Sequence, residues 1–326
     1  GMSAETLLLE LGCEELPSSA LRQLGESLHA VLLAKLAEQR LEHGDSRWFA
    51  TPRRLAVLVE ELAGEAPVET REALGPPVAQ ARDADGNWSR AAQGFAARQG
   101  VDPEALMEID TPKGPRLGLR QTVAGAKTAE RLNELVNEAV QELPIAKRMR
   151  WGASRVEFAR PVHWVVLIYG EQKGFGDVLG VTSGDESHGH RFHAPQTLRI
   201  DRPGDYAEQL REARVIADFT ERCDLIRSQV EAAAAQIGGR AIIDADLLEE
   251  VASLVEWPVA LAGSFDETFL EVPAEALISS MQSHQKYFPV VDDAGDLRPW
   301  FITVSNIESR DPQQVVAGNE KVIRPR

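Results

Sequence analysis

The chain has 326 residues, is 43% hydrophobic and carries a net charge of −16. This length predicts about two domains, and this apolar content excludes intrinsic disorder as the default state. The sequence has no apolar run of membrane-spanning length, and its two cysteines, Cys13 and Cys223, form no CxxC motif, so we expect a cytoplasmic protein without disulfides or membrane contact.

The first quarter of the sequence alternates between strand and helix patterns. Residues 6–11 form an apolar strand-like run, and Pro17 opens a helix whose pattern ends near residue 43. Residues 48–62 predict strand structure that is broken at Thr51-Pro52, because proline cannot donate within a central ladder. A long excursion rich in glycine, proline and aspartate is expected at 63–90.

The remaining elements follow from apolar periodicity and from capping residues. Ser89 can cap a short helix, and Asp218 with Glu221 fits a capping box. Helices are predicted at residues 90–99, 128–143, 219–237, 244–257 and 273–284. Strands are predicted at residues 115–125, 162–170, 178–184, 197–200, 259–263, 286–291 and 300–305.

These elements mix without the strict alternation of a parallel α/β protein, so the sequence predicts an α+β fold. We expect mixed sheets with packed helices, two or more subdomains, and no Rossmann or P-loop core. We place an N-terminal α+β domain at 2–145, which contains the excursion near 63–90. A second α+β domain is expected at 146–326.

The motifs of self-contained enzymes are missing from the sequence. It has no GxxxxGK[ST] loop, no HExxH, no GxSxG, and no GxGxxG between a strand and a helix. This pattern disfavours the common hydrolases, kinases and dehydrogenases, and we predict no catalytic residue in this chain.

A histidine cluster at 188–193 supports an alternative function, a metal-dependent hydrolase. His188 and His190 would share one face of a strand, and His193 could complete the three ligands that zinc requires. The glycine and arginine between them suit a loop that binds an anion equally well. We therefore predict no metal site and include His190 and Arg191 among the candidate RNA-binding residues.

Residues 146–164 concentrate positive charge in an acidic chain, with five basic side chains against a single acid, Glu157. Arginine makes bidentate phosphate contacts, and tryptophan offers a plane on which an unpaired base can stack. Alternatively, these arginines pair with acids elsewhere in the fold. The candidate RNA-binding residues of this basic stretch are Lys147, Arg148, Arg150, Trp151, Arg155 and Arg160.

A second polar and aromatic cluster lies at 281–290, at a predicted junction between a helix and a strand. Gln285, Lys286 and Tyr287 are candidate RNA-binding residues, because such a junction can present donors to a phosphate or a base edge. The alternative is an ordinary helix end, with Lys286 on the helix dipole and His284 packed in the core. Residues 241–280 hold nine acids and no base, which fits either a partner contact or a solvated surface.

Seven sequence blocks carry a resemblance along nearly the whole chain. They are LGCEELPSSAL (11–21), WFATPRRLAV (48–57), KRMRWGASRVEFARPVHW (147–164), GHRFHAP (189–195), EEVASLVEWPV (249–259), MQSHQKYFPV (281–290) and NIESRDPQQVVAGNEKVIRPR (306–326). The chain thereby resembles the N-terminal part of the β subunit of bacterial heterotetrameric glycyl-tRNA synthetase. One departure is Cys13, where the family has threonine.

The resemblance implies a tRNA-binding and assembly role in the ATP-dependent attachment of glycine to tRNA(Gly). Catalysis, ATP and Mg²⁺ would belong to the α subunit of an α2β2 assembly, so no cofactor is expected on this chain. HD-type and anticodon-binding domains would follow residue 326, and the fragment alone is expected to be inactive. Besides the hydrolase, the remaining alternative is an assembly module that binds α without touching RNA.

Overall fold

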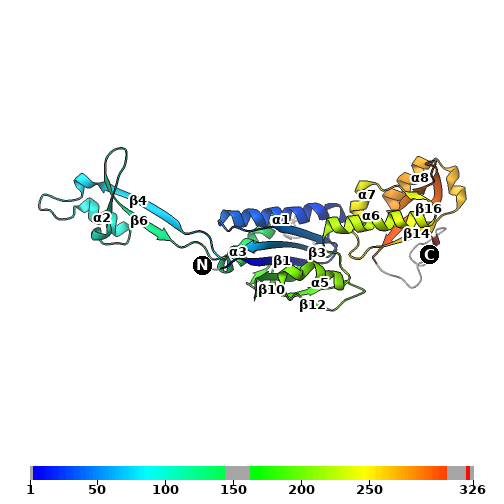
Figure 1. Cartoon of the computed structure of the whole chain (residues 1–326), viewed down its shortest axis with the longest axis horizontal. Coiled ribbons are helices and arrows are strands. Elements are labelled where there is room, and N and C mark those ends of the chain that lie inside the picture. Colours follow the sequence, from blue (N-terminus) through cyan, green and yellow to red (C-terminus); the bar gives the residue numbers. More distant parts are fainter. Residues whose placement is uncertain (1–2, 144–161, 307–320, 324–326) are drawn as a thin grey trace, which may run out of the picture. The chain divides into compact units, whose positions relative to one another are not determined.

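The computed structural model describes residues 3–143, 162–306 and 321–323, the last three as backbone alone. By their contacts the residues divide into two compact units (Figure 1). One unit combines residues 1–64 with 128–326, and the other comprises 65–127. The second unit is therefore an insertion between two segments that fold together.

The larger unit is built around a sheet with the strand order β2-β3-β1-β7-β10-β9, to which β8 adds beside β7. The pairs are antiparallel except for β10 with β7, which is parallel, so the sheet is mixed. The strands are β1 (Glu5–Cys13), β2 (Ser46–Thr51), β3 (Arg54–Leu62), β7 (Val162–Tyr169), β8 (Gln172–Lys173), β9 (Asp177–Val178) and β10 (Val181–Gly184).

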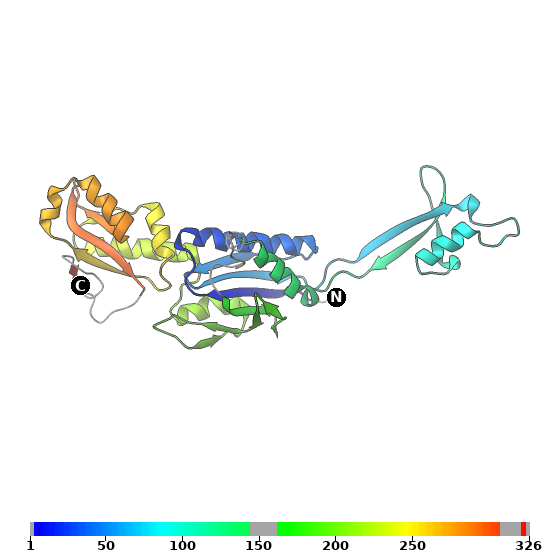
Figure 2. The same ribbon diagram turned by 180° about the vertical axis from the view of Figure 1, so that it is seen from behind.

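Both faces of this sheet are covered, which explains why β1 is buried almost along its whole length. Helix α1 (Leu21–Glu38) contacts β2 and β3, and α3 (Thr128–Gln141) packs beside α1 (Figures 1 and 2). On the other face, α5 (Tyr206–Glu212) and the hairpin of β11 (Glu186–His188) with β12 (Thr197–Arg199) cover a core that includes Leu8, Trp164 and Tyr206. Because side chains alternate along a strand, Glu10 points to the same face as Leu8.

A second sheet in this unit has the strand order β13-β15-β16-β14-β17 and is antiparallel. Its strands are β13 (Arg240–Ala241), β14 (Val259–Ser264), β15 (Phe288–Val291), β16 (Leu297–Ser305) and β17 (Lys321–Ile323). Its helices are α6 (Phe219–Gln236), α7 (Ala245–Ala252) and α8 (Ala274–Ser280), which continues into a π turn at Met281–Gln285.

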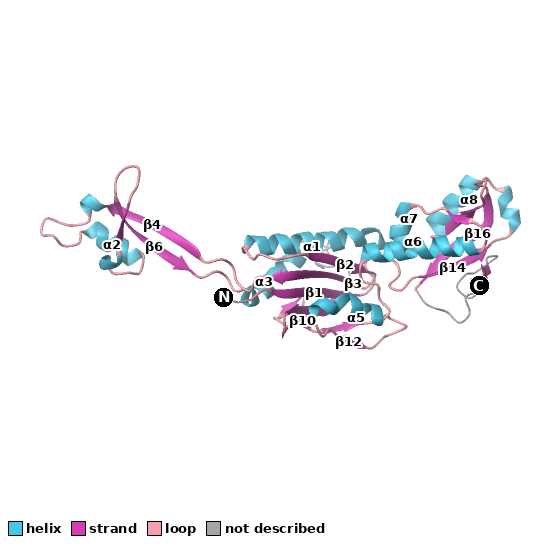
Figure 3. Ribbon diagram, in the orientation of Figure 1, coloured by secondary structure: helices cyan, strands magenta, loops and turns pink. Residues whose placement is uncertain are grey.

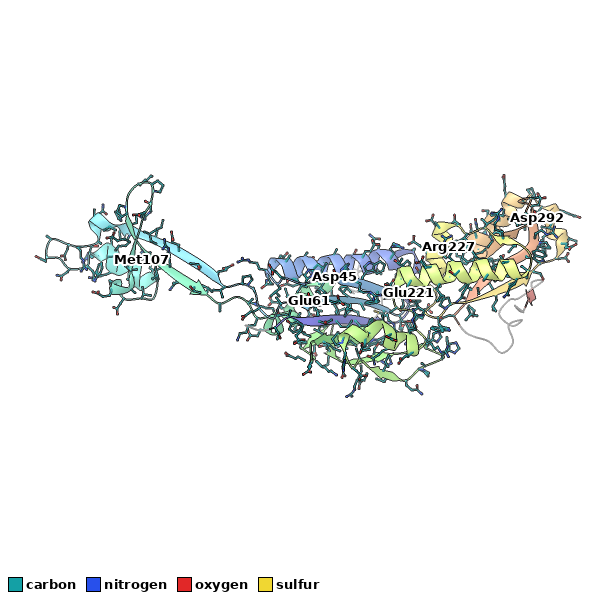
Figure 4. All side chains as sticks on the ribbon, viewed as in Figure 1. Asp45, Glu61, Met107, Glu221, Arg227 and Asp292 are labelled. Carbon is teal, nitrogen blue, oxygen red and sulfur yellow. The ribbon has the colours of Figure 1, made fainter. Side chains whose placement is uncertain are left out.

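Helix α6 begins at the cap that the sequence predicts and connects the two sheets. The carboxylate of Asp218 accepts a hydrogen bond of 3.0 Å from the backbone N–H of Glu221 (labelled in Figure 4). Arg222, in the first turn of α6, is fully buried and donates to the carbonyls of Ala50 at 2.7 Å and Ala252 at 2.8 Å. Because Ala50 belongs to β2, this arginine holds α6 against the first sheet.

The inserted unit is a small sheet with the order β4-β6-β5, packed against one helix (Figure 3). Its elements are β4 (Glu69–Pro77), α2 (Arg90–Arg98), β5 (Met107–Ile109) and β6 (Arg116–Val123). Ser89 caps α2 as predicted, by accepting from the N–H of Ala92 at 3.2 Å. The predicted excursion at 63–90 is only partly irregular, because β4 pairs with β6 through Glu69–Pro77 despite its glycine and prolines.

The α+β class with mixed sheets is confirmed. The compact units do not follow the boundary drawn at residues 145 and 146, because β1 and β7 come from opposite sides of it and pair directly. Helix α1 ends at Glu38, five residues before the predicted end at residue 43. Among the described residues, no helix combines the length and the apolar character needed to cross a membrane.

Candidate functional site

The site forms where β2 turns into β3. Thr51 pairs with Arg54, so Pro52 and Arg53 make a two-residue turn, and the fixed φ of proline suits the first position of such a turn. Two adjacent arginines at this turn differ in how deeply their side chains are buried. The side chain of Arg54 is fully buried, whereas that of Arg53 is 21% exposed.

Arg54 lies between two buried carboxylates. Its guanidinium is 3.5 Å from Glu10 Oε2 and 3.0 Å from Glu256 Oε2, and it also donates to the carbonyl of His188 at 2.8 Å. Burial alone would lower the pKa of Arg54, but the charges of Glu256 and Glu10 outweigh burial and raise it above its ordinary value. This pairing joins three segments that are far apart in sequence, namely β1, β3 and the segment between α7 and β14 that contains Glu256.

Glu10 also organises the aromatic side chains around it. It accepts hydrogen bonds from Trp164 Nε1 at 2.5 Å, from Ser187 Oγ at 2.5 Å and from the Tyr206 hydroxyl. The ring of Trp164 fits against β1 because Gly12 has no side chain, since a Cβ there would lie 1.8 Å from Trp164 Cδ2. The network therefore fixes the position of Trp164 from both its polar and its apolar sides.

A groove of about 610 Å³ lies over this network, a size within the range of small-ligand sites. Its lining residues are Cys13, Glu14, Glu15, Arg53, His163, Trp164, His188 and Arg191. The Arg53 guanidinium lies 5.6 Å from the centre of the Trp164 ring, and the His188 ring packs on the same indole at 4.4 Å. The interior part of the groove is thus cationic and aromatic.

Titratable groups in the groove differ in how strongly they are paired. His163 contacts Glu14 at 3.2 Å, and Arg191 lies 4.0 Å from Glu15, with all four side chains substantially exposed. Exposed pairs of this kind contribute little to stability. Burial, followed by the charges of Arg53 and Arg54, lowers the pKa of His188, so this ring is neutral at pH 7.

His190, predicted to face RNA, is buried and fully hydrogen-bonded instead. Its Nδ1 accepts from the backbone N–H groups of Phe192 and His193, both at 3.1 Å, so Nε2 carries the proton and donates to Asn306 Oδ1 at 3.0 Å. Burial lowers its pKa, which favours this neutral form. Both ring nitrogens are used within the protein, so the arrangement does not present His190 as a metal ligand. Among the described residues, no group of three or more His, Cys, Asp or Glu side chains is placed to hold a metal ion.

The predicted cluster at 285–287 lies at the junction between the π turn and β15, and two of its members make contacts within the protein. The ammonium group of Lys286 contacts Glu250 at 3.0 Å and the Ser283 carbonyl at 2.8 Å, and the residue adopts the left-handed conformation with φ 62°. The Tyr287 ring stacks on Phe301 with 4.2 Å between centres. Gln285 and His284 are exposed on the π turn, so the packed position considered for His284 is wrong.

Residues 146–161 of the basic stretch lie outside the described residues. Its candidates Lys147, Arg148, Arg150, Trp151, Arg155 and Arg160 all lie outside the described residues. Of the other candidates, Arg191 lines the groove, together with His163 and Trp164 at the end of the basic stretch. Acids of the 241–280 segment form internal ion pairs, namely Glu249 with Arg22, Glu250 with Lys286 and Glu256 with Arg54.

Sequence reasoning missed the residues that build the site, which are Glu10, Arg53, Arg54 and Glu256. A signal for Glu10 and Arg54 was present in the sequence. Glu10 interrupts the apolar run of β1, and Arg54 begins the apolar run of β3. A charge placed in a buried strand requires a partner, so the two strands could have been matched by their charges.

Comparisons with known proteins point to one family and cover nearly the whole chain. The family model described as "Glycyl-tRNA synthetase beta subunit" matches residues 7–326. The glycine–tRNA ligase beta subunit of Hahella chejuensis is 50% identical over 326 residues, and those of Chromohalobacter salexigens and Azotobacter vinelandii are each 51% identical over 325 residues. In each case the match covers all of this chain and 47% of the relative, so the chain spans about half the length of these relatives. The chain belongs to the glycyl-tRNA synthetase beta subunit family.

Proposed function

We propose that this chain is the tRNA-contacting and assembly portion of a glycyl-tRNA synthetase β subunit. It supports the ATP-dependent attachment of glycine to tRNA(Gly), while ATP, Mg²⁺ and catalysis belong to an α subunit in an α2β2 assembly. The observation that carries this proposal is the family match from residue 7 to residue 326. The name beta subunit, shared by the relatives, supports a partner chain.

The RNA role is supported by where positive charge gathers. The last arginine of the basic stretch is Arg160, and β7 begins two residues later at Val162. The next residues, His163 and Trp164, line the groove that also contains Arg53 and Arg191. Focused positive charge on an acidic body attracts a polyanion locally, although the protein as a whole is negatively charged.

A salt series tests the RNA role of the basic stretch. Binding of labelled tRNA(Gly) is measured by fluorescence anisotropy for the unchanged chain and for the double variant Arg148→Ala/Arg150→Ala. Each lost phosphate contact should flatten the slope of log K against log salt by roughly 0.7–0.9, so the double variant should lose about 1.4–1.8. The matched control is Arg71→Ala/Arg120→Ala, which removes the same charge from exposed arginines of the inserted unit.

The outcome separates the proposal from its alternative. An unchanged slope in the first variant, or an equal loss in the control, would remove the RNA role of the basic stretch. Binding of the α subunit without any binding of tRNA would support the pure assembly module instead. In a glycylation assay, we expect the α subunit to attach glycine to tRNA(Gly) when it is mixed with the full-length β subunit. We expect no attachment when the α subunit is mixed with this 326-residue chain instead.

A further inference from the structure

Arg53 is a half-buried cation whose hydrogen-bonding capacity is largely unused among the described residues. Its Nη1 donates to the Gly189 carbonyl at 3.3 Å and lies 3.8 Å from Glu256 Oε1, which is too long for a hydrogen bond. A guanidinium has five N–H donors, and no described side chain or carbonyl accepts from Nε or Nη2 of Arg53. Removal from water without partners is unfavourable for a cation, and burial accordingly lowers the pKa of Arg53.

The neighbouring charges leave Arg53 available to an anion. Glu256 is shared, because its Oε2 already contacts Arg54 at 3.0 Å and accepts from Thr51 at 2.7 Å. The charge of Glu256 favours the charged form of Arg53, whereas the charges of Arg54 and Arg191 disfavour it. An anion in the groove would relieve this repulsion and satisfy the open donors. The carboxylates of the groove, Glu14 and Glu15, are 67% and 76% exposed and pair with His163 and Arg191.

We propose that the groove is a phosphate-binding site in which Arg53 is the anchoring ligand and Arg191 the second cation. The naming of RNA as the source of that phosphate rests on the proposed function. A planar guanidinium can donate two parallel hydrogen bonds to two phosphate oxygens, a fork geometry that the ammonium group of lysine does not offer. Arg191 is 59% exposed and reaches the groove from the loop after β11, so it can adjust to the ligand.

The turn and the network beneath it hold Arg53 in place before any ligand arrives. Pro52 restricts the turn, and the backbone N–H of Arg53 donates to Thr51 Oγ1 at 3.2 Å. The next residue, Arg54, is fixed by Glu10 and Glu256. Because Arg53 is held on a rigid element, its side chain loses less conformational entropy when an anion binds. This arrangement favours a specific site over loose surface attraction.

Three probes distinguish the sources of the phosphate in binding assays on the 326-residue chain. Inorganic phosphate and AMP present a phosphomonoester-type dianion, and a labelled single-stranded oligoribonucleotide presents phosphodiesters. Binding of phosphate or AMP but not of the oligonucleotide would assign a terminal phosphate, and binding of the oligonucleotide would assign the RNA backbone. Either result supports the site if it depends on Arg53, and binding of none of the probes overturns it.

Matched variants give the dependence on Arg53. Arg53→Gln should weaken binding by about 10- to 100-fold, the usual effect of losing a hydrogen bond to a charged group, and Arg53→Lys should recover part of it. Arg120→Gln, outside the groove, should bind as the unchanged chain does. If Arg53→Gln fails to fold by circular dichroism, Arg191→Gln tests the same groove, because its side chain is largely exposed.

Ring signals of the histidines locate the ligand by nuclear magnetic resonance. Addition of the bound probe should shift His163 and His188, which line the groove, and leave His29, which contacts Ser46 at 2.7 Å outside it, unchanged. Undiminished binding by Arg53→Gln, or shifts at His29 and not at His188, would overturn the site.

If tRNA binds with a slope of log K against log salt that depends on Arg148 and Arg150 but not on Arg53, this inference fails and the proposed function stands. Phosphate held by Arg53 without any tRNA binding would support the site and overturn the proposed function.

Discussion

Replacing Arg54 by methionine tests whether the buried ion network holds the larger unit together. Arg54→Met keeps a side chain of similar length but leaves the carboxylates of Glu10 and Glu256, which are 0% and 1% exposed, without their cation. Each pair at 3.0–3.5 Å is worth about 5 kcal/mol at an effective dielectric constant of 20, before desolvation is subtracted. Breaking a buried pair from one side typically costs about 3–5 kcal/mol, and we expect that loss here.

The assay is urea unfolding followed by circular dichroism and tryptophan fluorescence. The control, Arg47→Met, removes an arginine that is 47% exposed and pairs with Asp218 at 2.9 Å, so it should cost less than about 1 kcal/mol. Equal losses in the two variants would refute the view that the buried network carries the stability.

The pH dependence of the Arg54→Met effect has a definite sign. Burial raises the pKa of Glu256, but the charges of Arg54 and Arg53 and the Thr51 hydrogen bond outweigh burial and lower it below 4.5. In the unchanged chain, Glu256 therefore contributes stability above its unfolded pKa, and this contribution is lost as pH falls through the folded pKa. Without Arg54, burial becomes the dominant influence and raises the pKa of Glu256 in the folded state. The Glu256 carboxyl of the variant therefore takes up a proton on folding at a higher pH than in the unchanged chain. The difference in unfolding free energy between the two proteins should therefore shrink from pH 7 to below about pH 4.5, and a constant difference would contradict the account.

Three further predictions concern packing, capping and thiol reactivity. Gly12→Ala places a Cβ 1.8 Å from Trp164 Cδ2 and should cost about 2–3 kcal/mol in urea unfolding, whereas Gly204→Ala, with no atom within 4 Å, should change stability by less than about 0.5 kcal/mol. Asp218→Ala removes the N-cap of α6 and should lower the unfolding free energy by about 1 kcal/mol. In thermal unfolding, Asp218→Asn should retain most of the stability that Asp218→Ala loses, because asparagine also caps helices. Equal losses in the two variants would place the effect outside the cap. Cys13 is 1% exposed and burial raises its pKa to about 12, so it should react with a thiol reagent at pH 8 only after denaturant is added, and rapid labelling of the native chain would contradict its burial.

Local signals in the sequence were enough to predict most elements. Ser89 and Asp218 cap their helices as expected, because a side-chain oxygen placed before an apolar-periodic run satisfies orphan N–H groups regardless of the rest of the fold. Pro52 marks the turn between β2 and β3 because proline has a fixed φ and no N–H to donate within a ladder. The inserted strand β4 was missed because Gly75 and the prolines at its end resemble a loop, and its pairing with β6 decides the outcome.

Long-range pairing was the part that the sequence could not provide. The groove exists because β1 lies between β3 and β7, which brings Arg53 to Trp164 across more than a hundred residues of sequence. No composition or periodicity encodes that neighbourhood. The contacts of Lys286 with Glu250 and of Tyr287 with Phe301 were likewise not apparent from the sequence.

Crosslinking of the complete complex tests the central claim most directly. A tRNA(Gly) carrying photoreactive uridines is bound to the α subunit with the full-length β subunit, irradiated, and the crosslinked peptides are mapped. The account predicts crosslinks within the segment from Lys147 to Arg191, which contains the basic stretch and several residues that line the groove. Crosslinks confined to the α subunit, or to parts of the β subunit outside this chain, would contradict it.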